Sequence, residues 1–244
     1  MRNYKEEFEK RVQWLKNKLS ESGAKGFIYG NSGGKDCTLV SILCKAACDN
    51  TLGVIMPCES RRNFNEDKDD AILAAEKFGI ENITVDITGI KRAALDAINP
   101  VCELSSLALA NVNPRLRMMT LYAIAQMKGL LVVGTGNRSE RTMGYFTKWG
   151  DGGCDLNPIS DLTVRETYEF LRYLDAPASI IEKAPSAGLW EGQTDEQEMG
   201  ITYNEIDDYL LEGVATDEAR DKIERAKKRS AHKLRMPALY EESL

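Results

Sequence analysis

One glycine-rich stretch carries the residues best suited to chemistry: residues 30–37, with the sequence Gly-Asn-Ser-Gly-Gly-Lys-Asp-Cys. An apolar run precedes it and helical apolar spacing follows it, which predicts a strand-to-helix turn. Glycines there let the backbone approach an anion, and the free N–H groups of the new helix attract phosphate. A phosphate would repel the carboxylate of Asp36 unless a divalent cation lay between them. The stretch therefore predicts a pyrophosphate loop with magnesium, although a tight glycine turn capped by Ser32 or Asp36 also fits the spacing.

A second glycine turn, residues 134–140, follows a later apolar run and ends in Glu140. If the two preceding strands are adjacent and parallel, Glu140 can reach the same cation as Asp36. Two carboxylates, with phosphate oxygens and water in the remaining positions, suit the octahedral demand of Mg²⁺. From the spacing alone, a solvated position at a helix start explains Glu140 equally well.

Two further segments are typical of binding regions. Residues 144–158 are dense in glycine, aromatic and charged residues and lack the apolar periodicity of a packed core, which favours a binding loop.

Residues 111–118 open a helix with a proline followed by Arg115 and Arg117. Because cations at a helix start oppose its dipole, these arginines indicate an anionic ligand or partner.

The elements that must position these clusters follow from periodicity. Short apolar runs lie at 24–29, 51–57, 82–87 and 130–134, and amphipathic helical patterns at 67–78 and 115–127 lie between them. This alternation predicts one α/β domain spanning 1–244, with a doubly wound, mostly parallel sheet flanked by helices. Ligands of such sheets bind at the carboxyl ends of strands, where both glycine turns fall.

Composition narrows the class of protein. The chain has 244 residues, 43% apolar and 29% charged, which is enough for a sizeable core. Its net charge of −6 argues against nucleic-acid binding, and no apolar run is long enough to span a membrane. Residues 1–18 read as an amphipathic helix rather than a signal peptide, so we expect a cytoplasmic protein.

Cysteine and histidine usage excludes several chemistries. The six cysteines form no Cys-x-x-Cys pair, so neither a disulfide scaffold nor a zinc ribbon is expected. His232 is the one histidine, which leaves little material for a serine-histidine hydrolase or a histidine metal site. Catalysis is therefore expected to rest on carboxylates, lysines, arginines and backbone groups.

Taken in order, these clusters closely resemble the ammonia-dependent NAD synthetases, a family of the ATP pyrophosphatase superfamily. The resemblance covers nearly the whole chain. It rests on Ser-Gly-Gly-Lys-Asp at 32–36, Asn-Val-Asn-Pro-Arg-Leu-Arg-Met at 111–118, Gly-Thr-Gly-Asn-Arg-Ser-Glu at 134–140, Phe-Thr-Lys-Trp-Gly-Asp-Gly-Gly-Cys-Asp at 146–155, Gly-Leu-Trp-Glu-Gly-Gln-Thr-Asp-Glu at 188–196 and His-Lys-Leu-Arg at 232–235. It implies an adenine nucleotide alpha-hydrolase-like fold and a homodimer with substrate near the subunit interface.

The resemblance also implies a ligase of NAD biosynthesis that uses ATP and Mg²⁺. The nicotinate carboxylate of deamido-NAD attacks the α-phosphorus of ATP, and ammonia then attacks the acyl adenylate, which yields NAD, AMP and pyrophosphate. Asp36, Ser32 and Asp151 are the implied catalytic residues, Asp151 as acceptor of a proton from ammonia, and Asp36 and Glu140 the magnesium ligands. The implied ATP contacts are Gly30, Asn31, Ser32, Gly33, Gly34, Lys35, Asp36, Cys37, Thr135 and Ser186. The implied deamido-NAD contacts are Arg115, Arg117, Lys148, Asp155, His232 and Lys233.

Departures from the family pattern leave alternatives open. Cys37 replaces a serine, and Val164 stands where the family has a phosphate-binding lysine, for which Arg165 or Lys183 are nearby substitutes. These changes fit lower activity or an altered substrate. They also fit two other classes of protein: a sulfur-transferring ATP pyrophosphatase and a catalytically silent nucleotide-binding paralogue. The chain has no room for an attached glutaminase, so ammonia is expected from solution or from a separate partner.

Overall fold

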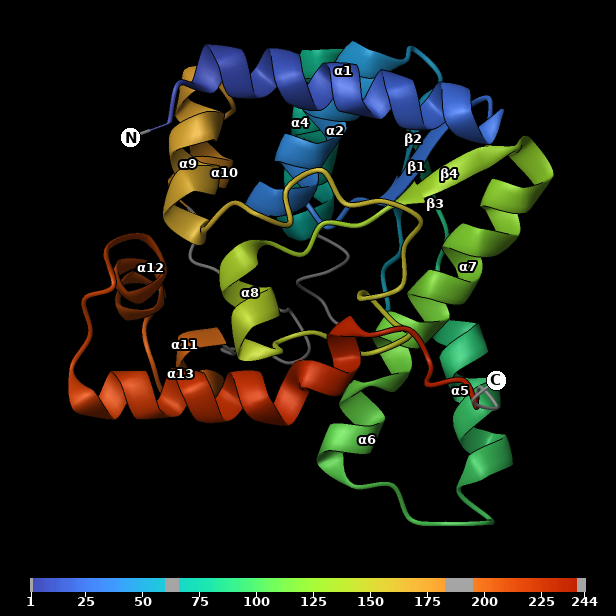
Figure 1. The fold of residues 1–244 in the computed structure, drawn as a ribbon. Coiled ribbons are helices and arrows are strands. Elements are labelled where there is room, and N and C mark those ends of the chain that lie inside the picture. The colour runs from blue at the N-terminus through green and yellow to red at the C-terminus, as the bar shows by residue number, and fades with distance from the viewer. Residues whose placement is uncertain (1, 60–65, 183–194, 241–244) are drawn as a thin grey trace.

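The fold is built on a sheet of four parallel strands that lies between helices (Figure 1). The computed structural model describes residues 2–59, 66–182 and 195–240. In this part of the chain the strands are β1 (Gly26–Gly30), β2 (Thr51–Ile55), β3 (Glu81–Thr84) and β4 (Leu130–Val133), in the order β3-β2-β1-β4. β1 pairs in parallel with both β2 and β4. The four predicted strands are therefore confirmed, with their ends moved by a few residues.

Helices make up most of the remaining described chain. None of the described helices is long and apolar enough to cross a membrane. The helices are α1 (Tyr4–Ser22), α2 (Lys35–Ala47), α4 (Glu66–Phe78), α5 (Thr88–Ile98), α6 (Ser106–Ala110), α7 (Val112–Lys128), α8 (Arg138–Met143), α9 (Val164–Tyr173), α10 (Ala178–Glu182), α11 (Asp195–Met199), α12 (Tyr203–Glu212), α13 (Asp217–Ser230) and the 3₁₀ helix η1 (Ala231–Leu234).

Successive residues of β1 point to opposite faces of the sheet and so belong to two separate cores. Phe27 and Tyr29 pack with Leu39 of α2 in a core that α1, α4 and α9 also cover. Ile28 packs with Leu121 of α7 in the core on the other face. All five side chains are buried, which is why this strand reads as a continuous apolar run rather than an alternating one.

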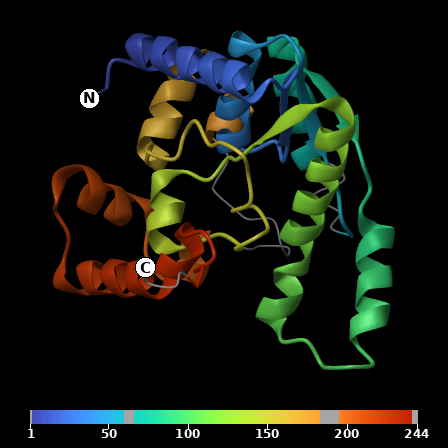
Figure 2. The same ribbon diagram turned by 45° about the vertical axis from the view of Figure 1, so that its right-hand side comes forward.

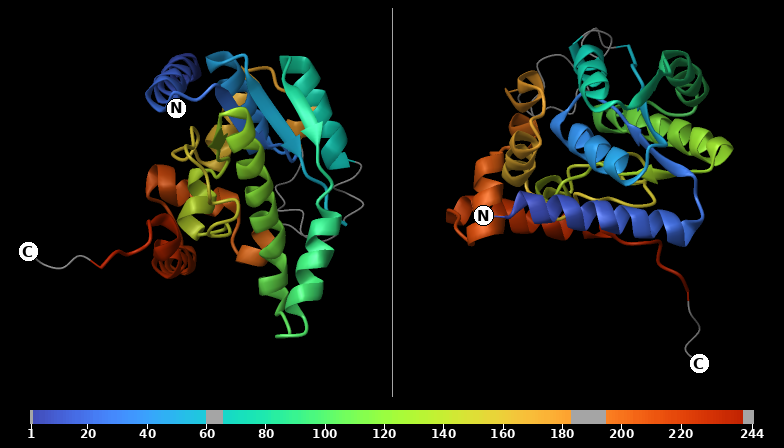
Figure 3. Two further views of the ribbon diagram at one scale, coloured as in Figure 1. Left: turned by 90° about the vertical axis from the view of Figure 1, so that its right-hand side faces the viewer. Right: turned by 90° about the horizontal axis from the view of Figure 1, so that it is seen from above.

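The sheet is doubly wound, as predicted. From β1 the chain runs outward to β2 and β3 with α2 and α4 on one face, and then returns beside β1 as β4 with α7 on the other face. The view from above in Figure 3 shows α1 and α7 on opposite sides of the strands. The winding direction reverses between β1 and β4, and in such folds the ligand crevice lies beyond the carboxyl ends of these two strands.

A third core holds the carboxy-terminal helices against α8 and α9. Met143 and Val164 pack there with Ile206 of α12 and Ile223 of α13. In Figure 2, α12 and α13 lie on the side of α8 away from α5 and α7, which run beside each other beyond the sheet. This small core places α13 and η1 along the edge of the crevice.

The contact between α8 and α13 depends on a glycine. Gly144 ends α8 with φ of +65°, and a Cβ there would lie 2.0 Å from the Cβ of Ser230. We expect Gly144→Ala to lower the free energy of unfolding by roughly 3 kcal/mol, through left-handed strain and overpacking together.

Gly213 is the matched control, because it ends α12 with φ of +72° and a Cβ there would meet nothing within 4 Å. Gly213→Ala should therefore cost about 1 kcal/mol, from backbone strain alone. Urea unfolding of both variants measures the difference. Equal losses of stability would show that close packing at Ser230 contributes nothing.

Candidate active site

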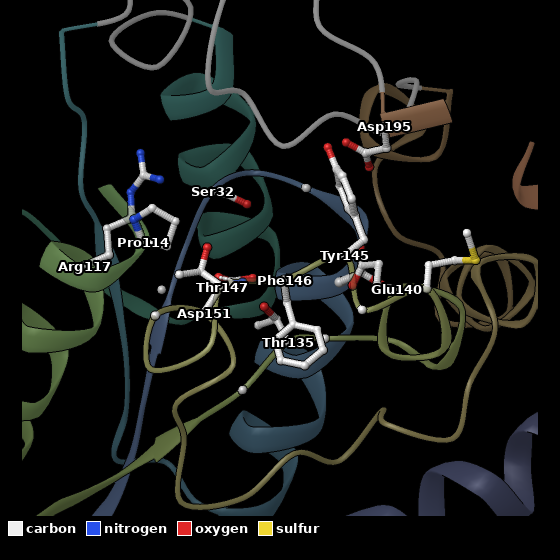
Figure 4. A pocket seen from close by; sticks show the side chains of 18 of the residues that line it. Ser32, Pro114, Arg117, Thr135, Glu140, Tyr145, Phe146, Thr147, Asp151 and Asp195 are labelled. Atoms are coloured by element: carbon white, nitrogen blue, oxygen red, sulfur yellow. Dashed lines mark hydrogen bonds between the residues drawn. The ribbon is translucent and has the colours of Figure 1, made fainter. Parts of the chain in front are cut away.

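A large cavity of about 1270 Å³ opens beyond the carboxyl ends of β1 and β4. Its walls come from both predicted glycine turns, the start of α7, the loop at 144–153, and α13 with η1. Figure 4 shows side chains from these separate segments facing one space, among them Ser32, Arg117, Glu140 and Asp151. The sheet topology therefore unites four of the sequence clusters.

The first glycine turn is held from behind by a buried asparagine. The side-chain oxygen of Asn31 accepts the Gly33 N–H at 3.2 Å, and its amide donates to Asn82 at 3.0 Å. Gly33 has φ of +72°, which favours glycine. α2 then begins at Lys35 after Gly34, which has no side chain to cap the helix. Lys35, Asp36 and Cys37 line the cavity, so the N–H groups at this helix start, which no side chain caps, suit a phosphate there.

Cys37 lies inside this turn. Its thiol is 3.1 Å from the Gly34 carbonyl oxygen and 3.5 Å from the Ser32 hydroxyl. The side chain is buried, and burial raises the pKa of the Cys37 thiol. A neutral thiol is a poor nucleophile, so this geometry does not favour sulfur-transfer chemistry at Cys37.

Asn137 joins the two predicted metal ligands. It caps α8 in a capping box in which Glu140 accepts the Asn137 N–H at 3.1 Å. Its side-chain amide donates to Asp36 at 3.2 Å. Burial and the neighbouring Asp36 raise the pKa of Glu140 well above its ordinary value. Such mutual repulsion is relieved when a cation binds between two carboxylates.

The donor set fits a magnesium ion that takes most of its ligands from substrate and water. Asp36 and Glu140 are hard oxygen donors from the first turns of α2 and α8, which follow the adjacent strands β1 and β4, and both line the cavity. Among the described residues, no group of three or more histidine, cysteine or acidic side chains could hold a metal. Mg²⁺ commonly binds through one or two carboxylates plus phosphates, so a pair is sufficient.

Lys35 is the basic member of this cluster. Its ammonium lies 2.8 Å from the Asp36 carboxylate. Burial lowers the pKa of Lys35, but the negative charges of Asp36 and Glu140 outweigh burial and raise this pKa overall. Asp195 is also buried here, and its carboxylate accepts the Tyr203 hydroxyl at 3.0 Å. Sequence reasoning assigned no role to Asn137, Asp195 or Tyr203, which distant segments bring to this place.

Asp151 lies in the loop at 144–153, open to the cavity. Its carboxylate accepts the Thr147 N–H at 2.8 Å, which fixes its direction. Burial raises the pKa of Asp151, and the Thr147 N–H opposes this shift. The turn is tight: Trp149 has φ of +61°, and a Cβ at Gly150 would lie 2.9 Å from Pro114. A carboxylate with a raised pKa is suited to accept a proton.

The other predicted site residues divide into two groups. Thr135, Arg117, His232 and Lys233 line the cavity with the loop residues. The Lys233 ammonium donates to the carbonyl oxygens of residues 144 and 146, which ties η1 to the Asp151 loop. Ser186 and the alternative cation Lys183 lie outside the described residues.

The second group, Arg115, Lys148 and Asp155, does not line the cavity of the single chain. The Lys148 ammonium donates to the His232 carbonyl oxygen at 2.8 Å, and Arg115 donates to the Lys148 carbonyl oxygen at 3.4 Å. The Asp155 carboxylate accepts the Val132 N–H at 2.7 Å and so lies against β4. Their predicted contacts with substrate remain predictions.

Val164 and Arg165 do not replace the missing lysine. Val164 is buried in the core between α9, α12 and α13. The Arg165 guanidinium pairs with Asp208 and Glu212 of α12, away from the cavity. Lys35 is therefore the described lysine nearest to the predicted metal ligands, since it contacts Asp36 directly.

A phosphate loop at the switch point of a doubly wound sheet, with a carboxylate pair in the same cavity, defines an α/β nucleotide-binding enzyme. The model of the NAD synthase family matches residues 7–238. The chain belongs to the NAD synthase family, as its motifs predicted.

Known relatives agree with this assignment. The NH3-dependent NAD+ synthetase of Carboxydothermus hydrogenoformans is 49% identical over 238 residues, which cover 96% of this chain and 97% of that protein. The structure of NMN synthetase from Francisella tularensis matches with a TM-score of 0.92 and 38% identity, covering 98% of this chain and 99% of that one. The NH3-dependent NAD synthetase of Campylobacter jejuni matches with a TM-score of 0.80 and 28% identity, covering 99% and 100%. The predicted fold class and the prediction of a C–N ligase of this family are confirmed.

Proposed function

We propose that this protein uses ATP and ammonia to amidate deamido-NAD, forming NAD, AMP and pyrophosphate through an acyl adenylate. The observation that carries this proposal is the shared cavity: the phosphate loop, the Asp36–Glu140 pair and Asp151 all face it. Relatives named NH3-dependent NAD+ synthetases support the choice of substrates.

In the first step, a nicotinate carboxylate oxygen bonds to the α-phosphorus of ATP and the bond to pyrophosphate breaks. The N–H groups at the start of α2, with Ser32, hold the phosphates and stabilise the charge that develops on the leaving group. Mg²⁺, when bound, would be held by Asp36 and Glu140 and would supply further neutralisation of the pyrophosphate.

In the second step, the ammonia nitrogen bonds to the acyl carbon and AMP departs with the bridging oxygen. The attacking nitrogen must lose a proton, and Asp151 faces the cavity with its carboxylate held by Thr147. Arg117 and Lys233, which both line the cavity, hold the anionic substrate. A cavity walled on several sides limits hydrolysis of the adenylate by water.

A second candidate substrate is the mononucleotide counterpart of deamido-NAD. It is favoured by the TM-score of 0.92 to an NMN synthetase, against 0.80 to the Campylobacter NAD synthetase. The reaction would be the same amidation, because the reacting nicotinate carboxylate is identical. Since Arg115, Lys148 and Asp155 lie outside the single-chain cavity, the adenylate half of a dinucleotide needs a contact surface beyond it.

The test is a direct competition between the two substrates. Deamido-NAD or nicotinate mononucleotide is added to purified protein with ATP, Mg²⁺ and ammonium. The amide product, AMP and pyrophosphate are then quantified in the same reaction. We expect equal amounts of the three products and a higher kcat/KM for deamido-NAD. A preference for the mononucleotide would establish the second candidate. ATP binding without pyrophosphate from either substrate would reject both.

A homodimer is part of the proposal, and an exposed apolar surface supports it. α5 and α6 have no buried residues, and large apolar side chains of the α5–α7 region are exposed. They are Ile90, Val101, Leu107, Leu109, Met119 and Met127. Exposed apolar side chains gathered on neighbouring helices support an interface with a second subunit. Sedimentation equilibrium should give twice the chain mass, and a monomer at micromolar concentration would oppose the dimer.

The cytoplasm is the proposed compartment. All six cysteines are free thiols, which suits a reducing environment. Deamido-NAD and ATP are the small-molecule partners of the proposal, with ammonia from solution or from a separate protein.

A further inference from the structure

Lys35 is an ammonium enclosed in the predicted metal site. Its side chain is only 7% exposed, and its nitrogen lies 2.8 Å from one oxygen of the Asp36 carboxylate. The same nitrogen lies 5.8 Å from the ring centre of Tyr168 and 5.7 Å from that of Tyr203. Aromatic faces at this distance attract a cation, so the ammonium is held on several sides.

Both oxygens of Asp36 are already engaged. Lys35 occupies Oδ2, and the Asn137 amide donates to Oδ1 at 3.2 Å. Asn137 is fixed by the capping box at the start of α8, whereas the lysine ammonium lies at the end of a flexible stem. A divalent ion that binds Asp36 must therefore displace Lys35 more readily than Asn137.

The charges nearby explain why an ammonium is stable here. Asp36, Glu140 and Asp195 bring three carboxyl groups to this corner of the cavity. Buried carboxylates repel one another unless a cation balances them. Lys35 supplies that cation from within the chain, at the position where metal charge would otherwise be required.

We propose that Lys35 is a built-in counter-cation that competes with divalent metal for Asp36 and gives way when nucleotide phosphates arrive. Lys35 is the first residue of α2, next to the glycine turn, so a displaced ammonium remains beside the phosphate site. Metal uptake is thereby coupled to ATP uptake. This inference rests on the metal ligands of the proposed function, but not on the identity of the substrate that is amidated.

Binding of Mn²⁺ without nucleotide tests the proposal, with free Mn²⁺ followed by electron paramagnetic resonance. We expect Lys35→Met to bind Mn²⁺ about tenfold more tightly than the wild-type protein, because a cation in contact with the ligand is removed. With α,β-methylene-ATP present, the difference between the two proteins should shrink. Equal or weaker Mn²⁺ binding by Lys35→Met would overturn the proposal.

Two controls locate the effect. Lys45 lies on the same helix and pairs with the exposed Asp49. Lys45→Met should therefore leave Mn²⁺ affinity unchanged. The double variant Lys35→Met with Asp36→Asn should lose the tightened binding, because the ligand itself is gone. Tightened binding that persists without Asp36 would contradict competition at this carboxylate.

Loss of the counter-cation also destabilises the metal-free protein. Without metal, Lys35→Met should melt at a lower temperature than the wild-type protein. Mn²⁺ should raise the melting temperature of Lys35→Met by more than it raises that of the wild-type protein. If Lys35→Met does not fold, Lys35→Gln replaces it, because an amide can still donate to Asp36 without adding charge. A Lys35→Gln protein with wild-type Mn²⁺ affinity would reject the inference, whether or not the protein makes NAD.

Discussion

Asp36→Asn will reduce pyrophosphate release by about a thousandfold, because it removes the carboxylate that both the metal and the departing pyrophosphate depend on. The change preserves the size of the side chain, and the new amide oxygen can still accept the Asn137 donor at Oδ1. The Lys35 ammonium loses its charged partner at the same time. Steady-state release of pyrophosphate, measured at saturating ATP and Mg²⁺, gives the size of the loss.

Asp49→Asn is the matched control for Asp36→Asn. Asp49 follows the carboxyl-terminal end of α2, is almost fully exposed and pairs with Lys45. It should keep wild-type activity, since exposed ion pairs contribute little. Circular dichroism shows whether Asp36→Asn is folded. A folded Asp36→Asn protein within tenfold of wild-type activity would show that pyrophosphate release does not depend on the Asp36 carboxylate.

Asp151→Asn will separate the two chemical steps. Asparagine can still accept the Thr147 N–H but cannot take a proton from ammonia. We expect adenylation to continue while amide formation falls by about 100-fold to 10,000-fold, the usual contribution of a general base. Rapid quenching after mixing with ATP and deamido-NAD measures pyrophosphate and NAD separately in one reaction.

The raised pKa of Asp151 gives this prediction a pH signature. A base works only when deprotonated, so amide formation by the wild-type protein should decline as pH falls through that raised pKa. Asp151→Asn should show no such step at its lower rate. Asp175→Asn is the control, because Asp175 is exposed and pairs with Lys77. Equal losses of pyrophosphate and NAD in Asp151→Asn would refute a role confined to the second step.

Three of the four strands could be predicted because each is a short run of apolar residues buried within the sheet. β3 lies at the edge of the sheet and is only partly buried, and the run that predicted it, 82–87, ends in the buried Ile87. Phe27, Ile28 and Tyr29 point to alternate faces, and helices cover both faces. α5 and α6 were not predicted as separate helices. α5 does have the apolar spacing of an amphipathic helix, so its periodicity was present in the sequence and was overlooked. α6 has only five residues, which is too few for a helical period to show.

The phosphate loop could be predicted because its chemistry is local to residues 30–37. The surroundings of Lys35 could not, because Tyr168, Asp195 and Tyr203 come from segments far along the chain. For Asp155 the motif predicts a substrate contact, which remains a prediction, and the fold adds that its carboxylate accepts the Val132 N–H of β4. Spacing identifies a residue type at a loop but not the direction of its side chain.

The transfer of oxygen from substrate to AMP shows whether amidation passes through an acyl adenylate. Deamido-NAD with oxygen-18 in both oxygens of the nicotinate carboxylate is converted in the presence of ATP, Mg²⁺ and ammonium. The masses of the products are then measured by mass spectrometry. Attack of the carboxylate on the α-phosphorus, followed by amidation of the acyl adenylate, predicts one labelled oxygen in each AMP and none in pyrophosphate. Label in pyrophosphate or in inorganic phosphate, or unlabelled AMP beside newly formed NAD, would contradict it.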